Sequence, residues 1–270
     1  MLRPVKSERS IPAVLSIAGS DSGGGAGIQA DLKAFAACGV HGMTAITAIT
    51  AQNTVGVDRI EPVSPEMIVA QIKAVADDIG VDAVKIGMLG DRPTIEAVCA
   101  GLDLLGEVPV VLDPVMVSES GAELLEREAR DSLVSLILPR ATVTTPNIPE
   151  ARVITGIEGS QSELARGIVA RGAGIAVVTG GHSDDYIDLF FDGRREEEIG
   201  GEIYPDRSAH GSGCTHSSAL ASFLALGFDP LEAARRARAL ASRAVAESLE
   251  AIGSGPGPVN ALGLRSPDRE

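Results

Sequence analysis

A glycine-rich turn beside a cysteine, residues 210–215 with the sequence HGSGCT, holds the side chains of this chain best suited to chemistry. We expect this turn to open a helix, and free backbone N–H groups at a helix start form an anion site. A thiol held there ionises more easily. If a phosphoryl group lies over the amides of Gly211, Ser212 and Gly213, Cys214 stands where a proton leaves an attacking hydroxyl. A helix entry with an inert, buried cysteine is the alternative that the hexapeptide leaves open.

The composition argues against a nucleic-acid or membrane partner. The 270 residues include 23 basic and 37 acidic side chains, which gives a net charge of −14 that opposes binding to polyanions. Aromatic residues make up 3% of the chain and tryptophan is absent, which leaves few platforms for base stacking. An anionic ligand must therefore be held locally, by backbone amides and a few cations.

The cysteines and the N-terminus indicate a cytoplasmic protein. Cys38, Cys99 and Cys214 form no CxxC pair and are odd in number, which argues against a disulfide framework or a zinc cluster. The N-terminus lacks the apolar core of a signal peptide, and no apolar run reaches the roughly 18 residues of a membrane span. We expect a cytoplasmic location in a reducing compartment.

The alternation of apolar runs and amphipathic stretches predicts an α/β fold, in which helices cover both faces of a mostly parallel sheet. The elements must position the candidate residues at the ends of strands. Strands are expected at 13–18, 43–51, 83–86, 108–112, 141–144 and 174–179, helices at 28–38, 65–78, 94–105, 122–137, 161–171, 213–226 and 230–251, and antiparallel edge strands at 186–191 and 198–204. No linker divides the chain, so residues 1–270 are expected to form a single domain with polar tails at 1–10 and 264–270.

Ligands of such sheets bind at the carboxyl ends of the strands, and the first strand is followed by the glycine-rich stretch 19–27. Part of it fits the GxGxxG/A dinucleotide pattern, which makes a nicotinamide or flavin enzyme the natural rival. That rival lacks its ribose-binding acid, because no Asp or Glu occurs between Asp31 and Asp58. We expect the loop to close over a small or flat ligand, with Asp21 available for a polar contact. A plain flexible turn is the alternative.

Polar residues follow four more of the predicted strands. Gln52 can donate to and accept from a heterocycle, although a solvent-facing glutamine is the more common case. Asp113 and Glu150 could share a hydrated Mg²⁺, assisted by Asn147. The spacing of Asn147 and Glu150 also fits a capping box, which needs no ligand. The last of these strands ends in a turn with the sequence TGGH at 179–182, whose amides could lie near a nucleotide.

Six segments then identify a family. They are residues 18–33, 47–57, 84–89, 112–117, 145–151 and 210–215, and they occur in order between about Ala13 and Asn260. Together they resemble the hydroxymethylpyrimidine/phosphomethylpyrimidine kinases of thiamine biosynthesis, which belong to the ribokinase-like superfamily. The resemblance covers nearly the whole chain.

The resemblance implies an ATP-dependent kinase with a ribokinase-like three-layer α/β/α architecture and roughly eight to ten strands. It implies transfer of the ATP γ-phosphoryl group to 4-amino-5-hydroxymethyl-2-methylpyrimidine and then to its monophosphate. It also implies a homodimer, since relatives commonly form dimers. The residue roles carried over are the pyrimidine pocket at Gly19, Gln52 and Met88, the anion hole at Gly211, Ser212 and Gly213, the catalytic position at Cys214, the metal and phosphate positions at Asp113, Asn147 and Glu150, and the nucleotide turn at Thr179 and Gly181.

Two departures from the family pattern accompany the resemblance. Glu119 is acidic in a segment where the family often has a basic residue, and the usual Gly-His-rich tail is replaced by the sequence GSGPGPVN at 253–260. Three different functions also stay open. A pyridoxal kinase of the same superfamily would share the fold and the anion hole. A dinucleotide-dependent oxidoreductase and a noncatalytic pyrimidine-binding protein are the second and the third.

Overall fold

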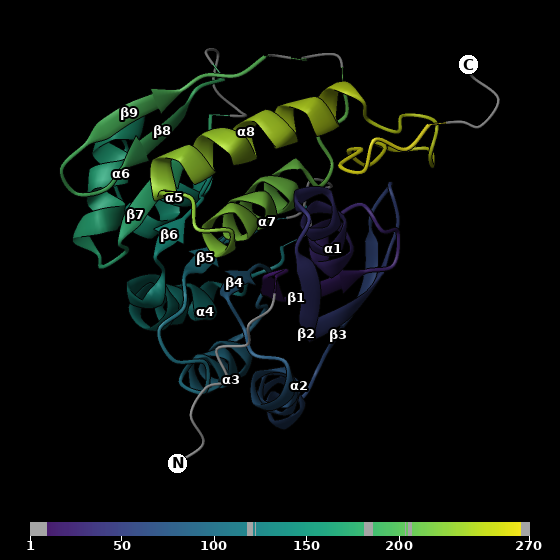
Figure 1. The fold of residues 1–270 in the computed structure, drawn as a ribbon, viewed down its shortest axis with the longest axis vertical. Helices are drawn as coiled ribbons and strands as arrows, with labels where there is room; N and C mark the ends of the chain where they lie inside the picture. The colour runs from purple at the N-terminus through teal and green to yellow at the C-terminus, as the bar shows by residue number, and fades with distance from the viewer. Residues whose placement is uncertain are drawn as a thin grey trace.

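A sheet of nine strands runs through the centre of the computed structural model, which describes residues 10–117, 121, 123–180, 186–202, 204 and 207–265 (Figure 1). The strand order is β3-β2-β1-β4-β5-β6-β7-β8-β9. The strands are β1 (Ala13–Asp21), β2 (His41–Gln52), β3 (Val57–Pro62), β4 (Ala83–Ile86), β5 (Val110–Leu112), β6 (Val143–Thr144), β7 (Ile175–Val178), β8 (Asp188–Phe191) and β9 (Glu196–Ile199). Neighbouring strands from β2 across the sheet to β7 pair in parallel, and the pairs β2–β3, β7–β8 and β8–β9 are antiparallel.

Helices cover both faces of the sheet, as the alternation predicted. The helices α1 (Gly27–Cys38), α7 (Ser212–Ala225) and α8 (Pro230–Ala246) lie on one face, where α7 packs against both α1 and α8 (Figure 1). The opposite face carries α2 (Pro65–Asp78), α3 (Arg92–Leu102), α4 (Arg127–Ser132) continued by a π-helical turn (Leu133–Ile137) and a 3₁₀ turn (Leu138–Arg140), α5 (Ile148–Thr155) and α6 (Gln161–Ala170). The predicted three-layer α/β/α class is confirmed.

The two faces of the sheet belong to two separate apolar clusters, because successive side chains of a strand point to opposite faces. On β1, Val14 packs in the cluster beneath α1, α7 and α8, whereas Leu15 and Ile17 pack beneath α2 and α3. On β4, Ala83 joins the first cluster and Val84 joins the second. This alternation assigns the residues of these central strands to their faces.

The chain changes direction across the sheet at β1, which has β2 on one side and β4 on the other. Such a switch point opens a crevice at the carboxyl ends of the two diverging strands, where α/β proteins bind their ligands. The glycine-rich loop follows β1 at this place, and the segment that contains Met88 follows β4. The fold therefore brings two of the predicted site segments together.

Some elements differ from the sequence-based expectation. The helix expected at 122–137 begins only at Arg127, because Glu123 and Leu125 form backbone bridges to Val117 and Gly90. The last edge strand is β9 at Glu196–Ile199, not 198–204, and α8 ends at Ala246 instead of 251. Neither β3 nor α5 was among the expected elements.

Among the described residues, no helix has the length and apolar character needed to cross a bilayer. The expected tails fall largely outside the described part of the chain, since residues 1–9 and 266–270 are not described.

Candidate active site

The glycine-rich loop after β1 and the turn before α7 contact each other at the carboxyl edge of the sheet. Gly211 has φ +82°, and a Cβ placed on it would overlap the carbonyl oxygen of Gly25. The backbone amide of Gly27, the first residue of α1, lies close enough to Cys214 to favour the charged form of its thiol and so to lower its pKa. The segments HGSGCT and GGGAG are far apart in sequence but in contact in the structure. Together they form one side of the candidate site, which we call the wall.

The helices that begin at this wall, α1 and α7, lack side-chain caps. Their N-cap residues are Ala26 and Gly211, and neither provides a capping side chain. Every other described helix of eight residues or more has one, provided by Ser64, Asp91, Asn147, Ser160 and Asp229. The start of α7 thus leaves backbone donors for a ligand, and its dipole favours an anion there.

The amides at the start of α7 are not equivalent. The N–H of Ser212 donates to the carbonyl of Ala209 at 2.8 Å, and the N–H of Thr215 donates to Gly211 at 2.9 Å. Among the described residues, the backbone N–H groups of Gly213 and Cys214 have no such acceptor. Gly213 is exposed, so its amide is accessible to a bound phosphoryl group.

The thiol of Cys214 is half-buried at the bottom of this wall. Burial raises its pKa to about 12; the charge of Lys85 opposes this rise, and the carboxylates of Asp31 and Asp113 add to it. The raised pKa contradicts the expectation that the helix start makes this thiol easier to ionise, because desolvation by burial is the largest influence on it. At neutral pH Cys214 is a neutral thiol.

The residues expected to hold a pyrimidine ring lie at the carboxyl ends of β1, β2 and β4. A Cβ at Gly19 would stand 3.1 Å from the sulfur of Met88, so the glycine and the thioether are in close contact. The hydroxyl of Thr47 donates to the carbonyl of Met88 at 2.8 Å and fixes that segment. Gln52 ends β2, and its side-chain oxygen accepts from Thr50 at 3.1 Å. The structure brings Gly19 and Met88 into contact and places Gln52 at the end of β2, which pairs with β1. Their binding of a pyrimidine stays a prediction.

The carboxylate of Asp21 shapes the glycine-rich loop. It accepts hydrogen bonds from the backbone N–H groups of Gly23, Gly25 and Ala26 at 2.8–2.9 Å, and it faces His210 at 3.7 Å. Burial raises its pKa, but the bonds from His210 and the backbone outweigh burial and hold the pKa below its usual value. The side chain is 3% exposed, so these contacts account for most of its surroundings, and the predicted substrate contact stays a prediction.

Two carboxylates meet at the ends of β5 and β6. Asp113 is buried and accepts a hydrogen bond from Ser217 at 3.0 Å. Glu150 caps α5 in the expected capping box with Asn147, and it also accepts from the N–H of Met116 at 3.4 Å. Burial, together with the charge of Asp113, raises the pKa of Glu150 to about 8. A cation would relieve this repulsion, and one or two carboxylates are what magnesium takes from a protein.

The turn after β7 borders the same edge. Thr179 bridges to Asn147, and its N–H donates to the carbonyl of Pro146 at 2.8 Å. Gly180 has no room for a side chain, because a Cβ there would overlap the carbonyl of Ile187. Gly181 and Glu119 lie outside the described residues.

The sequence analysis missed a buried ion pair beneath this edge, formed by Lys85 of β4 and Asp31 of α1 at 2.8 Å. Both side chains are completely buried. The signal was present in the sequence, since Lys85 interrupts an apolar strand of four residues, but its partner lies 54 positions away.

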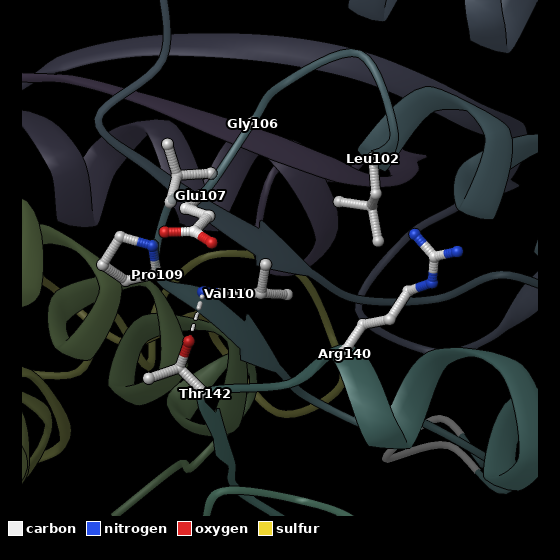
Figure 2. A pocket seen from close by; sticks show the side chains of 8 residues that line it. Leu102, Gly106, Glu107, Pro109, Val110, Arg140 and Thr142 are labelled. Carbon is white, nitrogen blue, oxygen red and sulfur yellow. Dashed lines mark hydrogen bonds between the residues drawn. The ribbon is translucent and has the colours of Figure 1, made fainter.

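A surface hollow lies elsewhere. Its volume is about 440 Å³, and it is bordered by the segment before β5, the end of α3 and the segment before β6 (Figure 2). These are the amino ends of the strands. Its Arg140 already pairs with Asp103, and Thr142 accepts from the N–H of Val110 at 3.0 Å. None of the predicted site residues borders it, so we assign the site to the carboxyl edge of the sheet.

Catalysis of phosphoryl transfer to an alcohol is mostly positioning and charge neutralisation. The start of α7 offers backbone donors beside Cys214, and the carboxylates of Asp113 and Glu150 follow the neighbouring strands. This arrangement can supply both. The class of protein that this fold and site define is a small-molecule kinase.

Comparisons with known proteins agree with this class. The family described as phosphomethylpyrimidine kinase matches residues 21–260. A hydroxymethylpyrimidine/phosphomethylpyrimidine kinase from Rhizobium meliloti (strain 1021) is 49% identical over 255 residues, which cover 91% of this chain and 95% of that protein. The chain belongs to the phosphomethylpyrimidine kinase family.

Two solved structures show the same fold. The phosphomethylpyrimidine kinase from Clostridium difficile 630 has a TM-score of 0.75 and 41% identity, and the match covers 84% of this chain and 96% of that chain. The pyridoxal kinase from Staphylococcus aureus in complex with ADP has a TM-score of 0.85 and 32% identity, and the match covers 94% of each chain. Of these two structures, the phosphomethylpyrimidine kinase has the higher sequence identity to this chain.

Proposed function

We propose that the chain phosphorylates 4-amino-5-hydroxymethyl-2-methylpyrimidine and then its monophosphate, with ATP as the phosphoryl donor, in thiamine biosynthesis. Membership of the family supports the reaction, and the ADP complex of the Staphylococcus aureus relative supports the nucleotide. The observation that carries the proposal for this chain is the meeting of the α1 and α7 starts beside Cys214.

In this proposal the pyrimidine ring lies in the pocket of Gly19, Gln52 and Met88, so that its hydroxymethyl group reaches Cys214. The amides at the start of α7 bind the oxygens of the phosphoryl group in transit, where negative charge develops. As a thiol, Cys214 orients the attacking hydroxyl; as a thiolate, its sulfur accepts the proton of that hydroxyl. The alcohol oxygen bonds to phosphorus as the bond between phosphorus and ADP breaks.

The nucleotide and its cation are assigned to the neighbouring strand ends. Asp113 and Glu150 would hold Mg²⁺, which neutralises phosphate charge when it is bound. Asn147 has its side-chain oxygen committed to the amide of Glu150 at 2.8 Å, so its part is to hold Glu150 in place. The turn at Thr179 and Gly181 would lie along the nucleotide.

Parallel assays of phosphate transfer from MgATP to the pyrimidine alcohol, to its monophosphate and to pyridoxal test the substrate. We expect turnover of both pyrimidines. Preferred turnover of pyridoxal, or stabilisation by NAD but not by MgATP in a thermal-shift assay, contradicts the proposal.

The role of Cys214 is tested with Cys214→Ala, which we expect to lower kcat by about 10²-fold to 10⁴-fold if the thiol acts as a general base. Cys99→Ala is the matched control, because Cys99 lies in α3 on the opposite face of the sheet. If Cys214→Ala keeps nearly full turnover with normal substrate binding, the amides alone provide catalysis and the thiol role is wrong.

A homodimer and a cytoplasmic location are proposals that rest on the family resemblance and on the sequence. Light scattering after size-exclusion chromatography measures the first. A mass of one 27.7 kDa chain contradicts it.

A further inference from the structure

The carboxylate of Asp188 lies at the start of β8, beside the turn that follows β7. Its Oδ1 atom accepts a hydrogen bond from the N–H of Gly180 at 3.0 Å. The guanidinium of Arg238, which comes from α8, lies 3.4 Å from the same oxygen and also donates to the carbonyl of Tyr186. Asp188 is 1% exposed, so one buried carboxylate joins the turn to both β8 and α8.

The backbone around this turn is fixed by other contacts as well. Gln161 of α6 donates to the carbonyl of Val178 at 3.3 Å and to that of Ile187 at 2.9 Å. Gly180 packs so closely against Ile187 that a Cβ on the glycine would lie 2.1 Å from the carbonyl oxygen. A shift of the turn would therefore break contacts to β8 and to α6.

Stability does not explain a charge at this place. Successive residues of a strand alternate between the two faces of the sheet, so Asp188 shares the face of Phe190, which packs in the apolar cluster beneath α7 and α8. The buried pair of Asp188 and Arg238 is weak evidence of stability, because desolvation can cost as much as the attraction returns. Among the described residues, the Oδ2 atom of Asp188 also has no hydrogen-bond partner, which is uncommon for a buried oxygen. The carboxylate therefore needs a functional explanation.

The second oxygen of Asp188 faces His216 of α7, whose Nε2 atom lies 3.7 Å away. His216 is buried, and neither of its ring nitrogens has a hydrogen-bond partner in the described part of the chain. Burial lowers its pKa and outweighs the opposing charge of Asp188, so the imidazole is neutral at neutral pH. His216 comes two residues after Cys214, near the start of the helix whose amides are assigned to the phosphoryl group. Asp188 thus lies between the two elements that the proposed function assigns to the nucleotide and to the group it transfers.

We propose that Asp188 is a positioning residue for the nucleotide, whose carboxylate holds the turn at Thr179 and Gly180 in place relative to the start of α7. This inference rests on the proposed function, which assigns the turn to ATP. Asp188 acts through the backbone of the turn and not through a contact with the substrate. It affects how tightly ATP binds, because a turn that is already fixed loses little conformational freedom on binding.

The test compares two variants that differ in one acceptor atom. Asp188→Asn/Arg238→Met and Asp188→Leu/Arg238→Met both remove the two charges, so that no unpaired charge remains buried. Asparagine keeps an oxygen for the N–H of Gly180, whereas leucine has a similar size and no acceptor. Replacing a buried ion pair by apolar residues of similar volume often leaves a protein folded. If leucine does not fit, Asp188→Val/Arg238→Met takes its place.

Asp192→Ala is the matched control. Asp192 follows the other end of β8, beside the amino end of β7. Its carboxylate accepts from the N–H of Arg194 at 2.9 Å and from that of Arg195 at 2.7 Å. The control therefore removes the same kind of turn contact at the edge of the sheet opposite the candidate site.

Isothermal titration calorimetry with MgATP measures the affinity. We expect the leucine variant to bind MgATP about tenfold more weakly than the asparagine variant, since loss of a buried acceptor shifts an equilibrium by about that factor. The control should bind it like the native protein. In kinase assays, KM for ATP should differ by the same factor between the two variants, whereas KM for the pyrimidine should differ by less than about twofold. Equal MgATP affinities in the two variants, or KM values that rise together for both substrates as in a merely structural loss, overturn the proposal.

The same measurements separate this inference from the proposed function. If the native protein binds MgATP but transfers no phosphate to either pyrimidine, while the two variants differ as expected, the proposed reaction fails and the role of Asp188 stands. If the native protein is an active kinase and the two variants bind MgATP equally, the inference about Asp188 fails alone. A native protein that binds no MgATP contradicts both.

Discussion

Replacing Gly211 by alanine tests the contact between the two glycine-rich segments directly. Gly211 has φ +82°, and a left-handed conformation costs an L-residue about 1–2 kcal/mol. Its new Cβ would also overlap the carbonyl oxygen of Gly25, a backbone atom that cannot rotate away. Overpacking of this kind costs about 1–3 kcal/mol more.

Gly227 provides the matched control for this variant. It follows α7 with φ +87°, and a Cβ there would meet nothing within 4 Å. Gly227→Ala therefore carries the backbone strain without the overlap. At about 2–4 °C per kcal/mol, we expect Tm of Gly211→Ala to fall at least about 2 °C below that of Gly227→Ala.

Activity should separate the two variants more sharply than stability. Relief of the overlap in Gly211→Ala moves the glycine-rich loop away from the start of α7, and a displacement of about 1 Å at reacting groups costs on the order of 10²-fold in rate. Gly227→Ala should keep native kcat. If steady-state assays with ATP and the pyrimidine alcohol give the same kcat/KM for both variants, the loop contact does not position the site.

Three further predictions concern the strand ends. The pKa of Glu150 is about 8 in the folded protein and about 4.5 otherwise, so the stability that this group contributes below pH 4.5 is lost as the pH rises through 8. Tm of Glu150→Gln should therefore fall less than that of the native protein over this pH range. Mg²⁺ should raise Tm of the native protein more than that of the variant. Asn147→Ala should lower stability by about 1 kcal/mol and Asn147→Ser much less, as measured by urea unfolding, because serine also caps helices; equal losses would refute a capping role. Gly19→Ala places a methyl group against the flexible thioether of Met88. KM for the pyrimidine should therefore rise, whereas KM for ATP and Tm should stay nearly unchanged. A rise in KM for ATP alone would place the pyrimidine elsewhere.

Much of the fold could be predicted because buried strands and amphipathic helices leave different periods in the sequence. The strand at Ala83–Ile86 and the helix at Pro65–Asp78 were predicted with their observed bounds, the helix being marked by Ser64 at its cap and Pro65 at its first position. β3 was missed because all of its residues are exposed or half-exposed, so that it carries no apolar pattern. Its pairing with β2 is a tertiary contact.

The candidate site could be predicted to the extent that it follows from strand direction. Parallel strands bring their carboxyl ends to one edge, so residues directly after strands, such as Gln52, Asp113 and Thr179, had to gather there. The ionisation of Cys214 could not be predicted, because it depends on how deeply the thiol is enclosed. A helix start and burial act in opposite directions, and only the structure shows that burial prevails.

The same limit applies to the charges beneath the site, and it indicates where this fold concentrates function. In the sequence, Asp31 looks like a solvated residue of an amphipathic helix and Lys85 like an exception in a buried strand. The structure joins them beneath the carboxyl edge of the sheet, where hydrophobic residues of similar size would pack at no desolvation cost. This sheet accepts that desolvation cost near its switch point, and the two nearest helices, α1 and α7, lack side-chain caps. Because neither feature favours stability, we infer that both serve the binding of a ligand.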